Sequence, residues 1–176
     1  MRSFFLTLFS LICFSVVGQV DAFQQDIVDY LNINGTQQQY SGAYDEMFDV
    51  LKRNFASANV PESVWDELKT DKRESLKEVT NFLTFAYRKH FTQEEIKAMT
   101  NFYSTSAAQK MVNQTGDLTE QDHQKIAAYY QSDVAKKLDT KKSELAEDIA
   151  EISGHWSRDL FAAKMSELVK KGYAPQ

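Results

Sequence analysis

The sequence has little of the covalent chemistry that stabilises many exported proteins, since Cys13 is the only cysteine among its 176 residues. Cys13 lies inside an N-terminal apolar run that we expect to be removed. The mature chain then has no disulfide, no thiol nucleophile and no thiolate metal ligand. Its stability must come from a hydrophobic core, which a chain of about 150 residues is long enough to bury within one domain.

Proline and strand-like patterns are equally scarce. Only two prolines occur, Pro61 and Pro175, and no run of alternating β-branched residues lies between turn residues. Apolar residues recur instead at spacings of three and four, which is typical of helices with one buried face. The sequence therefore predicts an all-α fold. We expect a compact bundle of about six or seven helices, with long C-terminal helices packed on a central helical hairpin.

Excess positive charge is also missing, because 20 Lys and Arg residues stand against 25 Asp and Glu residues, a net charge of −5. Nucleic-acid binding depends on neutralising phosphates with basic side chains. A mainly electrostatic hold on anionic lipid needs a basic surface as well. The charge therefore argues against both kinds of partner.

The N-terminal segment has the form of a secretory signal peptide. A basic start at Arg2 precedes an apolar run from Phe4 to Val17, and Val20 and Ala22 are residues that a signal peptidase accepts. We predict a signal peptide over residues 1–22, cleavage near Ala22, and a periplasmic or secreted domain over residues 23–176. The alternative is a retained N-terminal anchor, although the run is shorter than the roughly 20 apolar residues of a membrane span. No stable membrane span is expected after cleavage.

Helix-start signals recur along the mature chain. Thr92 with Glu95, Asp71 with Glu74, and Thr119 with Asp122 each have the spacing of a capping box, in which two side chains satisfy free N–H groups at a helix start. Residues 119–171 are predicted to form one, two or three helices, with a kink or short break at Gly154.

The sharpest local pattern lies in the segment from Phe91 to Met111. Phe91 before the cap and Ile96 one turn later form a hydrophobic staple, which sets the angle at which the chain enters the helix. Ser104 to Ser106 interrupts the helical pattern and can cap a second, short helix. The segment therefore predicts two helices joined by a tight bend.

This segment resembles the core motif of a bacterial family of exported helical proteins, domain of unknown function 2059. Ala108 stands where that family usually has glycine, and Ser106 where a proline is common. The resemblance implies an exported helical fold in a bacterium, and it carries over no catalytic residue because the family has no established activity. The motif positions, to which we assign a structural role, are Phe91, Thr92, Glu95, Ile96, Met99, Phe102, Tyr103, Thr105, Ala108 and Lys110.

Three histidines are the candidates for chemistry. Glu120 and His123 have the spacing of half a carboxylate-bridged di-metal site, but Glu151 and His155 are four apart and cannot supply the second half. His90 ends a helix, where it either stabilises the helix dipole or serves as a general base beside the motif. We assign no catalytic, cofactor-binding or metal-binding residue and expect no cofactor.

Export, a helical build and the lack of a convergent polar cluster favour a non-enzymatic binding module. Its partner would be an unidentified protein or cell-envelope component, and self-association is a further possibility. The alternative is a carrier of a small apolar or lipid ligand between helices, which the abundant Phe, Tyr and Met residues permit. A hydrolase or metal enzyme that uses His90, His123 or His155 is the least favoured hypothesis.

Overall fold

The computed structural model describes residues 21–176, and every regular element in that part of the chain is a helix. This confirms the all-α prediction. The predicted signal peptide lies outside the described residues except for Asp21 and Ala22, where Asp21 caps the first helix by accepting a hydrogen bond from Gln24 N. The elements are α1 (Ala22–Ile33), α2 (Thr36–Asn54), a short 3-10 helix (Ala56–Ala58), α3 (Glu62–Leu68), α4 (Lys72–His90), α5 (Gln93–Tyr103), α6 (Ser106–Asn113), α7 (Glu120–Tyr130) and α8 (Asp133–Lys170).

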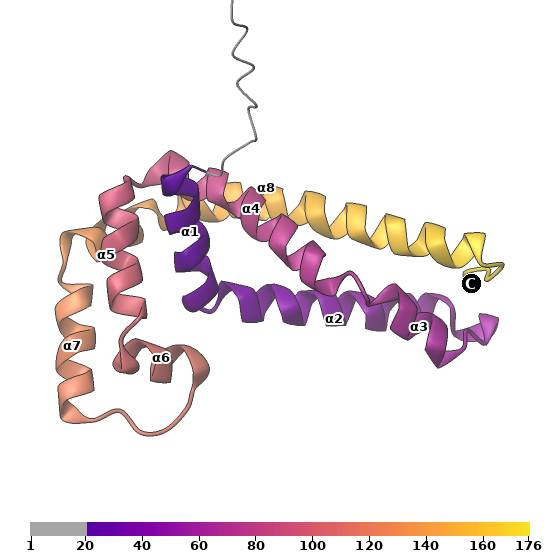
Figure 1. The fold of residues 1–176 in the computed structure, drawn as a ribbon, viewed down its shortest axis with the longest axis horizontal. Coiled ribbons are helices and arrows are strands. Elements are labelled where there is room, and N and C mark those ends of the chain that lie inside the picture. The colour runs from indigo at the N-terminus through magenta and orange to yellow at the C-terminus, as the bar shows by residue number, and fades with distance from the viewer. Residues whose placement is uncertain (1–20) are drawn as a thin grey trace, which may run out of the picture.

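The helices form an elongated body with two unequal parts (Figure 1). The long helices α2 and α8 extend along the longest axis and α4 runs obliquely to them, while α5, α6 and α7 gather at one end. Helix α1 contacts α2, α4 and α5 and so joins the two parts. The predicted hairpin of α5 and α6 therefore lies at one end of the body, where α5 contacts the first turns of α8.

The main core cluster runs through the long helices, and a smaller second cluster forms around Phe102, Ala108, Tyr129 and Ala135. Apolar side chains that are essentially inaccessible to solvent fill the main cluster because each long helix has a wide apolar face. The fully buried large side chains are Tyr44, Phe48, Phe55, Ile27, Leu31, Leu51, Leu68, Leu83, Ile96, Met99, Leu168 and Val79.

Two of the three predicted capping boxes are present. Thr92 Oγ1 accepts a hydrogen bond from Glu95 N while the Glu95 carboxylate accepts one from Thr92 N, and Thr119 and Asp122 repeat this arrangement at α7. Thr105 caps α6 by accepting from Ala108 N, as the bend at Ser104–Ser106 predicts. These signals are local, since each joins residues three apart in the sequence.

The predicted cap at Asp71 is wrong. Asp71 is the residue before α4, but its side chain makes no capping hydrogen bond. Its carboxylate instead accepts hydrogen bonds from the Tyr44 hydroxyl at 2.8 Å and from Lys164 Nζ at 2.6 Å. Two partners from other helices hold the side chain away from its own backbone.

Residues 120–170 form two helices. A turn at Gln131 and Ser132 separates α7 from α8, and the Ser132 hydroxyl caps α8 by accepting from Ala135 N. The predicted short break at Gly154 is absent, because α8 continues without interruption for 38 residues. None of the helices within residues 21–176 combines the length and the apolar character that crossing a membrane requires.

Candidate functional site

The three histidines lie in three different settings. His90 is buried at the end of α4, whereas His123 on α7 and His155 on α8 are exposed. Glu120, the proposed metal-site partner of His123, is exposed as well. No group of three or more His, Cys, Asp or Glu side chains within the described residues is arranged to hold a metal ion.

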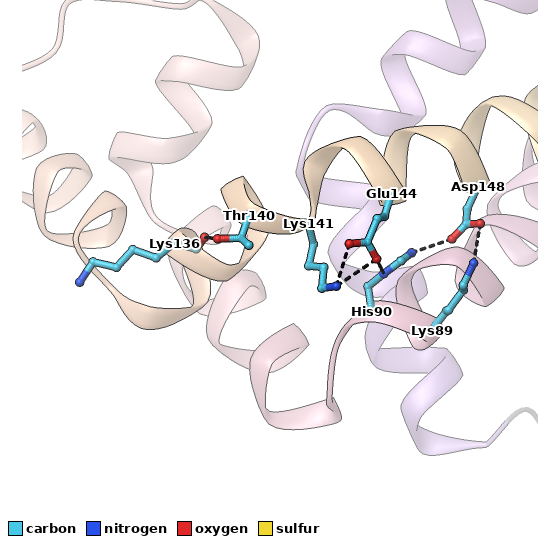
Figure 2. A network of polar contacts seen from close by, with 7 residues as sticks. All are labelled: Lys89, His90, Lys136, Thr140, Lys141, Glu144 and Asp148. Carbon is cyan, nitrogen blue, oxygen red and sulfur yellow. Dashed lines mark hydrogen bonds and ion pairs between the residues drawn. The ribbon is translucent and has the colours of Figure 1, made fainter.

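His90 binds to the adjacent face of α8 (Figure 2). Its Nε2 lies 2.6 Å from Asp148 Oδ2 and its Nδ1 lies 3.9 Å from a Glu144 carboxylate oxygen. Lys89 Nζ donates to the other oxygen of Asp148 at 2.8 Å, and the hydrogen bonds from Lys89 and His90 lower the pKa of that carboxyl. Both ring nitrogens face carboxylates and only 3% of the side chain is exposed, so the geometry favours a structural role over a general base.

The apolar motif residues are mostly buried between helices. Phe91, Ile96, Met99, Phe102 and Ala108 are inaccessible or nearly so. The ring of Phe102 stacks on that of Tyr129 in α7, with centroids 3.7 Å apart. Tyr103 is half-buried, and its ring contacts Tyr30 and Tyr129 edge-on. Burial of Tyr129 raises the pKa of its hydroxyl.

The two charged motif residues connect neighbouring helices. Glu95, which completes the cap of α5, accepts a hydrogen bond from Lys137 Nζ of α8 at 2.7 Å. Lys110 of α6 donates to Asp122 of α7 at 2.9 Å. Each charge of the motif therefore has a partner inside the fold, and this supports the structural role assigned from the sequence.

The Lys110–Asp122 pair predicts a dependence of stability on acid. The hydrogen bonds from Lys110 and from Thr119 N lower the pKa of Asp122 from 3.8 to about 2. A carboxyl whose pKa is lowered by folding stabilises the protein fully above its unfolded pKa and loses that contribution as the pH falls through its folded pKa. Asp122→Asn should therefore be less stable than the wild type at pH 6, with the difference shrinking between pH 4 and pH 2. Urea unfolding at a series of pH values measures this; a difference that stays constant down to pH 2 would contradict it.

A hollow of about 710 Å³ lies between α4 and α8, and we call it the α4–α8 groove. The two helices run side by side in opposite directions, since Asp71 pairs with Lys164, Ser75 with Trp156 and His90 with Asp148. Its volume falls within the roughly 300–1,000 Å³ of small-ligand sites. The lining residues are Asp71, Glu74, Ser75, Glu78, Phe82, Phe85, Glu151, Ile152, His155, Trp156, Asp159, Leu160 and Ala163.

The apolar lining of the groove includes two exposed phenylalanines. Phe82 is 46% exposed and Phe85 is 64% exposed, so both rings are accessible to water. Trp156 lines the groove from the opposite helix and is buried, and its indole N–H donates to the Ser75 hydroxyl at 3.1 Å. That hydrogen bond orients the indole and joins α8 to α4 in the lining of the groove.

Carboxylates surround this apolar lining. Glu74 and Glu78 lie one turn apart on α4, and Glu151 and Asp159 lie two turns apart on α8; we call these four residues the acidic rim. Among the described residues, Glu78, Glu151 and Asp159 have no ion-pair partner. The groove can therefore accept an apolar group together with positive charge, and it presents no nucleophile paired with a base.

The sequence did not reveal the groove, although one signal for it was present. Helical spacing places Leu76, Val79, Leu83, Ala86 and Tyr87 on one face of α4, and most of these side chains are buried. Phe82 and Phe85 lie outside that face, which leaves two large apolar residues without a place in the core. The carboxylates of α8 reach the groove only through tertiary packing.

The segment from the end of α4 to the start of α7 is the part of the chain that matches a known family. Residues 82–124 match the bacterial family described as an uncharacterized protein conserved in bacteria (DUF2059). The match confirms the resemblance inferred from the motif, and it spans Phe82, Phe85, the α5–α6 hairpin and the Lys110–Asp122 pair. No curated protein and no solved structure matches the chain. The family brings no activity with it, so the function has to be argued from the geometry.

Proposed function

We propose that residues 23–176 form a single exported domain, periplasmic or secreted, that acts as a non-enzymatic binding module through the α4–α8 groove. One observation carries the proposal. Phe82 and Phe85 expose large apolar surfaces in a hollow of the protein surface, whereas the apolar residues of the family motif pack inside the fold. Exposed apolar side chains gathered at a concave surface are typical of binding sites.

The alternative function is a carrier of a small apolar or lipid ligand. The volume of the groove would admit such a ligand. Against it, the exposed phenylalanines make the groove open to solvent, and the acidic rim repels the carboxylate of a fatty acid and the headgroup of an anionic lipid. The geometry therefore favours a binding surface over a carrier site.

The test begins with protein made from the full-length gene in a bacterial host and collected from the periplasm. Native mass spectrometry should give the mass of the chain from Phe23 to Gln176 without added ligand mass. Export is contradicted if the protein stays in the cytoplasm at full length. A stoichiometric ligand mass would favour the carrier instead.

The same protein is then titrated with the neutral apolar dye N-phenyl-1-naphthylamine, whose fluorescence rises on leaving water. We expect saturable binding that the double substitution Phe82→Ser and Phe85→Ser weakens about tenfold or more, equivalent to about 1.4 kcal/mol. Val169→Ser is the matched control, because Val169 is 52% exposed and does not line the groove. Equal dye binding by all three proteins would refute the groove as the binding surface.

A further inference from the structure

The α4–α8 groove is long enough to hold a third helix. On one side the lining extends from Asp71, the residue before α4, to Phe85 within α4. On the other side it extends from Glu151 to Ala163 of α8. At about 1.5 Å per residue these stretches span roughly 18–21 Å. The apolar part of the lining runs along α8 from Ile152 to Ala163, and Phe82 and Phe85 of α4 complete it. A groove of this length suits the apolar face of an amphipathic helix of about three to four turns.

The charges around the groove indicate which kind of helix would bind. The acidic rim places carboxylates on both sides of the apolar lining, and no Lys or Arg lines the groove. Lys77 Nζ lies 3.9 Å from Glu74 Oε1. Glu78, Glu151 and Asp159 have no ion-pair partner among the described residues. An acidic or neutral helix would leave these carboxylates uncompensated, whereas Lys or Arg beside an apolar face would pair with them.

We propose that the partner is a cationic amphipathic helix of another polypeptide, with apolar anchors at positions i, i+3 or i+4, and i+7 and with basic residues on both flanks. This inference rests on the proposed function and specifies the partner of the same site. The anchors contact Phe82, Phe85 and the edge of Trp156, and the basic flanks pair with Glu78 on one side and Glu151 on the other. A second copy of this chain is a poor occupant, because the protein carries a net charge of −5.

The test uses three synthetic peptides of about 14 residues without tryptophan. The first has Leu at the anchor positions and Lys on the flanks. The second replaces every Lys with Glu, and the third scrambles the first so that charge is kept and the apolar face is lost. Isothermal titration with the mature wild-type chain gives the affinities, and circular dichroism reports the helix formed by the peptide on binding.

We expect the first peptide to bind, to gain helix, and to bind at least about tenfold more tightly than either of the others at low salt. The double substitution Glu78→Lys and Glu151→Lys should weaken it about tenfold or more, and by less in 0.5 M salt because exposed charges are then screened. Glu46→Lys is the control, since Glu46 is exposed on α2 away from the groove.

The other outcomes separate this inference from the proposed function. Equal binding of the acidic peptide would overturn the charge preference and keep the groove as an apolar binding surface. Equal binding of the scrambled peptide would overturn the helical partner. If no peptide binds while the dye does, the inference fails and the groove remains a site for small molecules. If neither the peptides nor the dye binds, both proposals fail.

Discussion

Replacing Asp71 with alanine is expected to lower the free energy of unfolding by about 3 kcal/mol, the lower end of the range for removing one partner of a buried ion pair. Lys164 has only 4% of its side chain exposed, and without Asp71 the one carboxylate left near it within residues 21–176 is that of Glu167, at 3.6 Å. The Tyr44 hydroxyl loses its acceptor at the same time. We expect a loss at the lower end of that range because the Asp71 side chain is 48% exposed, so water can enter the space that its carboxylate leaves.

A second substitution distinguishes the buried charge from other effects. Lys164→Met removes the ammonium group and keeps the length of the side chain, and should cost no more than about 1 kcal/mol. The double variant Asp71→Ala with Lys164→Met should recover most of the free energy of unfolding that Asp71→Ala alone loses. Urea unfolding at pH 7 measures all of these variants.

The matched control is Asp45→Ala, which removes a carboxylate that is 53% exposed from its pair with Lys72. Exposed pairs contribute about 0–1 kcal/mol. If Asp71→Ala costs no more than Asp45→Ala, the buried lysine is not what makes Asp71 important. Asp71 and Lys164 join α4 to α8 at one end of the groove, so a loss of this pair should also weaken dye binding.

Met99→Ala should lower the free energy of unfolding by about 2–5 kcal/mol, because the side chain is fully buried and its removal leaves a cavity. Thr92→Ala in the same motif should cost about 1 kcal/mol, since it removes a helix cap and no core volume. Asn101→Ala is the control, because Asn101 is exposed on α5 and should change stability by less than about 0.5 kcal/mol.

This series tests whether the family motif serves folding or binding. If the motif is structural, Met99→Ala lowers stability and leaves the affinity of the folded protein for the groove peptide unchanged. Titration below the unfolding transition measures that affinity. A variant that keeps its stability and loses peptide binding would show that the motif takes part in recognition.

The sequence predicted those parts of the fold that depend on neighbours along the chain. The capping boxes at Thr92 and Thr119, the cap at Thr105 and the apolar faces of the long helices all appear in the structure. Each depends on residues three or four apart, which helix geometry brings together unless a tertiary partner competes for the side chain, as happens at Asp71. The family match has the same origin, because its motif is one local segment.

The candidate site could be predicted only in small part. Phe82 and Phe85 were visible as apolar residues outside the buried face of α4, but nothing local indicated that Glu151 and Trp156 lie opposite them. The polar contacts of His90 with Asp148 and of Asp71 with Lys164 join residues 58 and 93 positions apart. Such contacts depend on how α8 packs against α4, and periodicity does not specify that packing.

Asp71 shows the difference between what the local sequence predicts and what tertiary packing decides. By sequence alone it has the spacing of a helix cap, as Thr92 and Thr119 do, and those two side chains do form caps. In the folded chain its carboxylate binds Tyr44 and Lys164 instead. The sequence by itself determined an all-helical chain and where most of its helices begin, because those choices are made within one turn of backbone. Only the tertiary structure decided which helices lie together, and that packing created the groove. The physical reason is that a lysine buried in α8 needs a carboxylate partner, and a residue distant in the sequence, at the start of α4, supplies it.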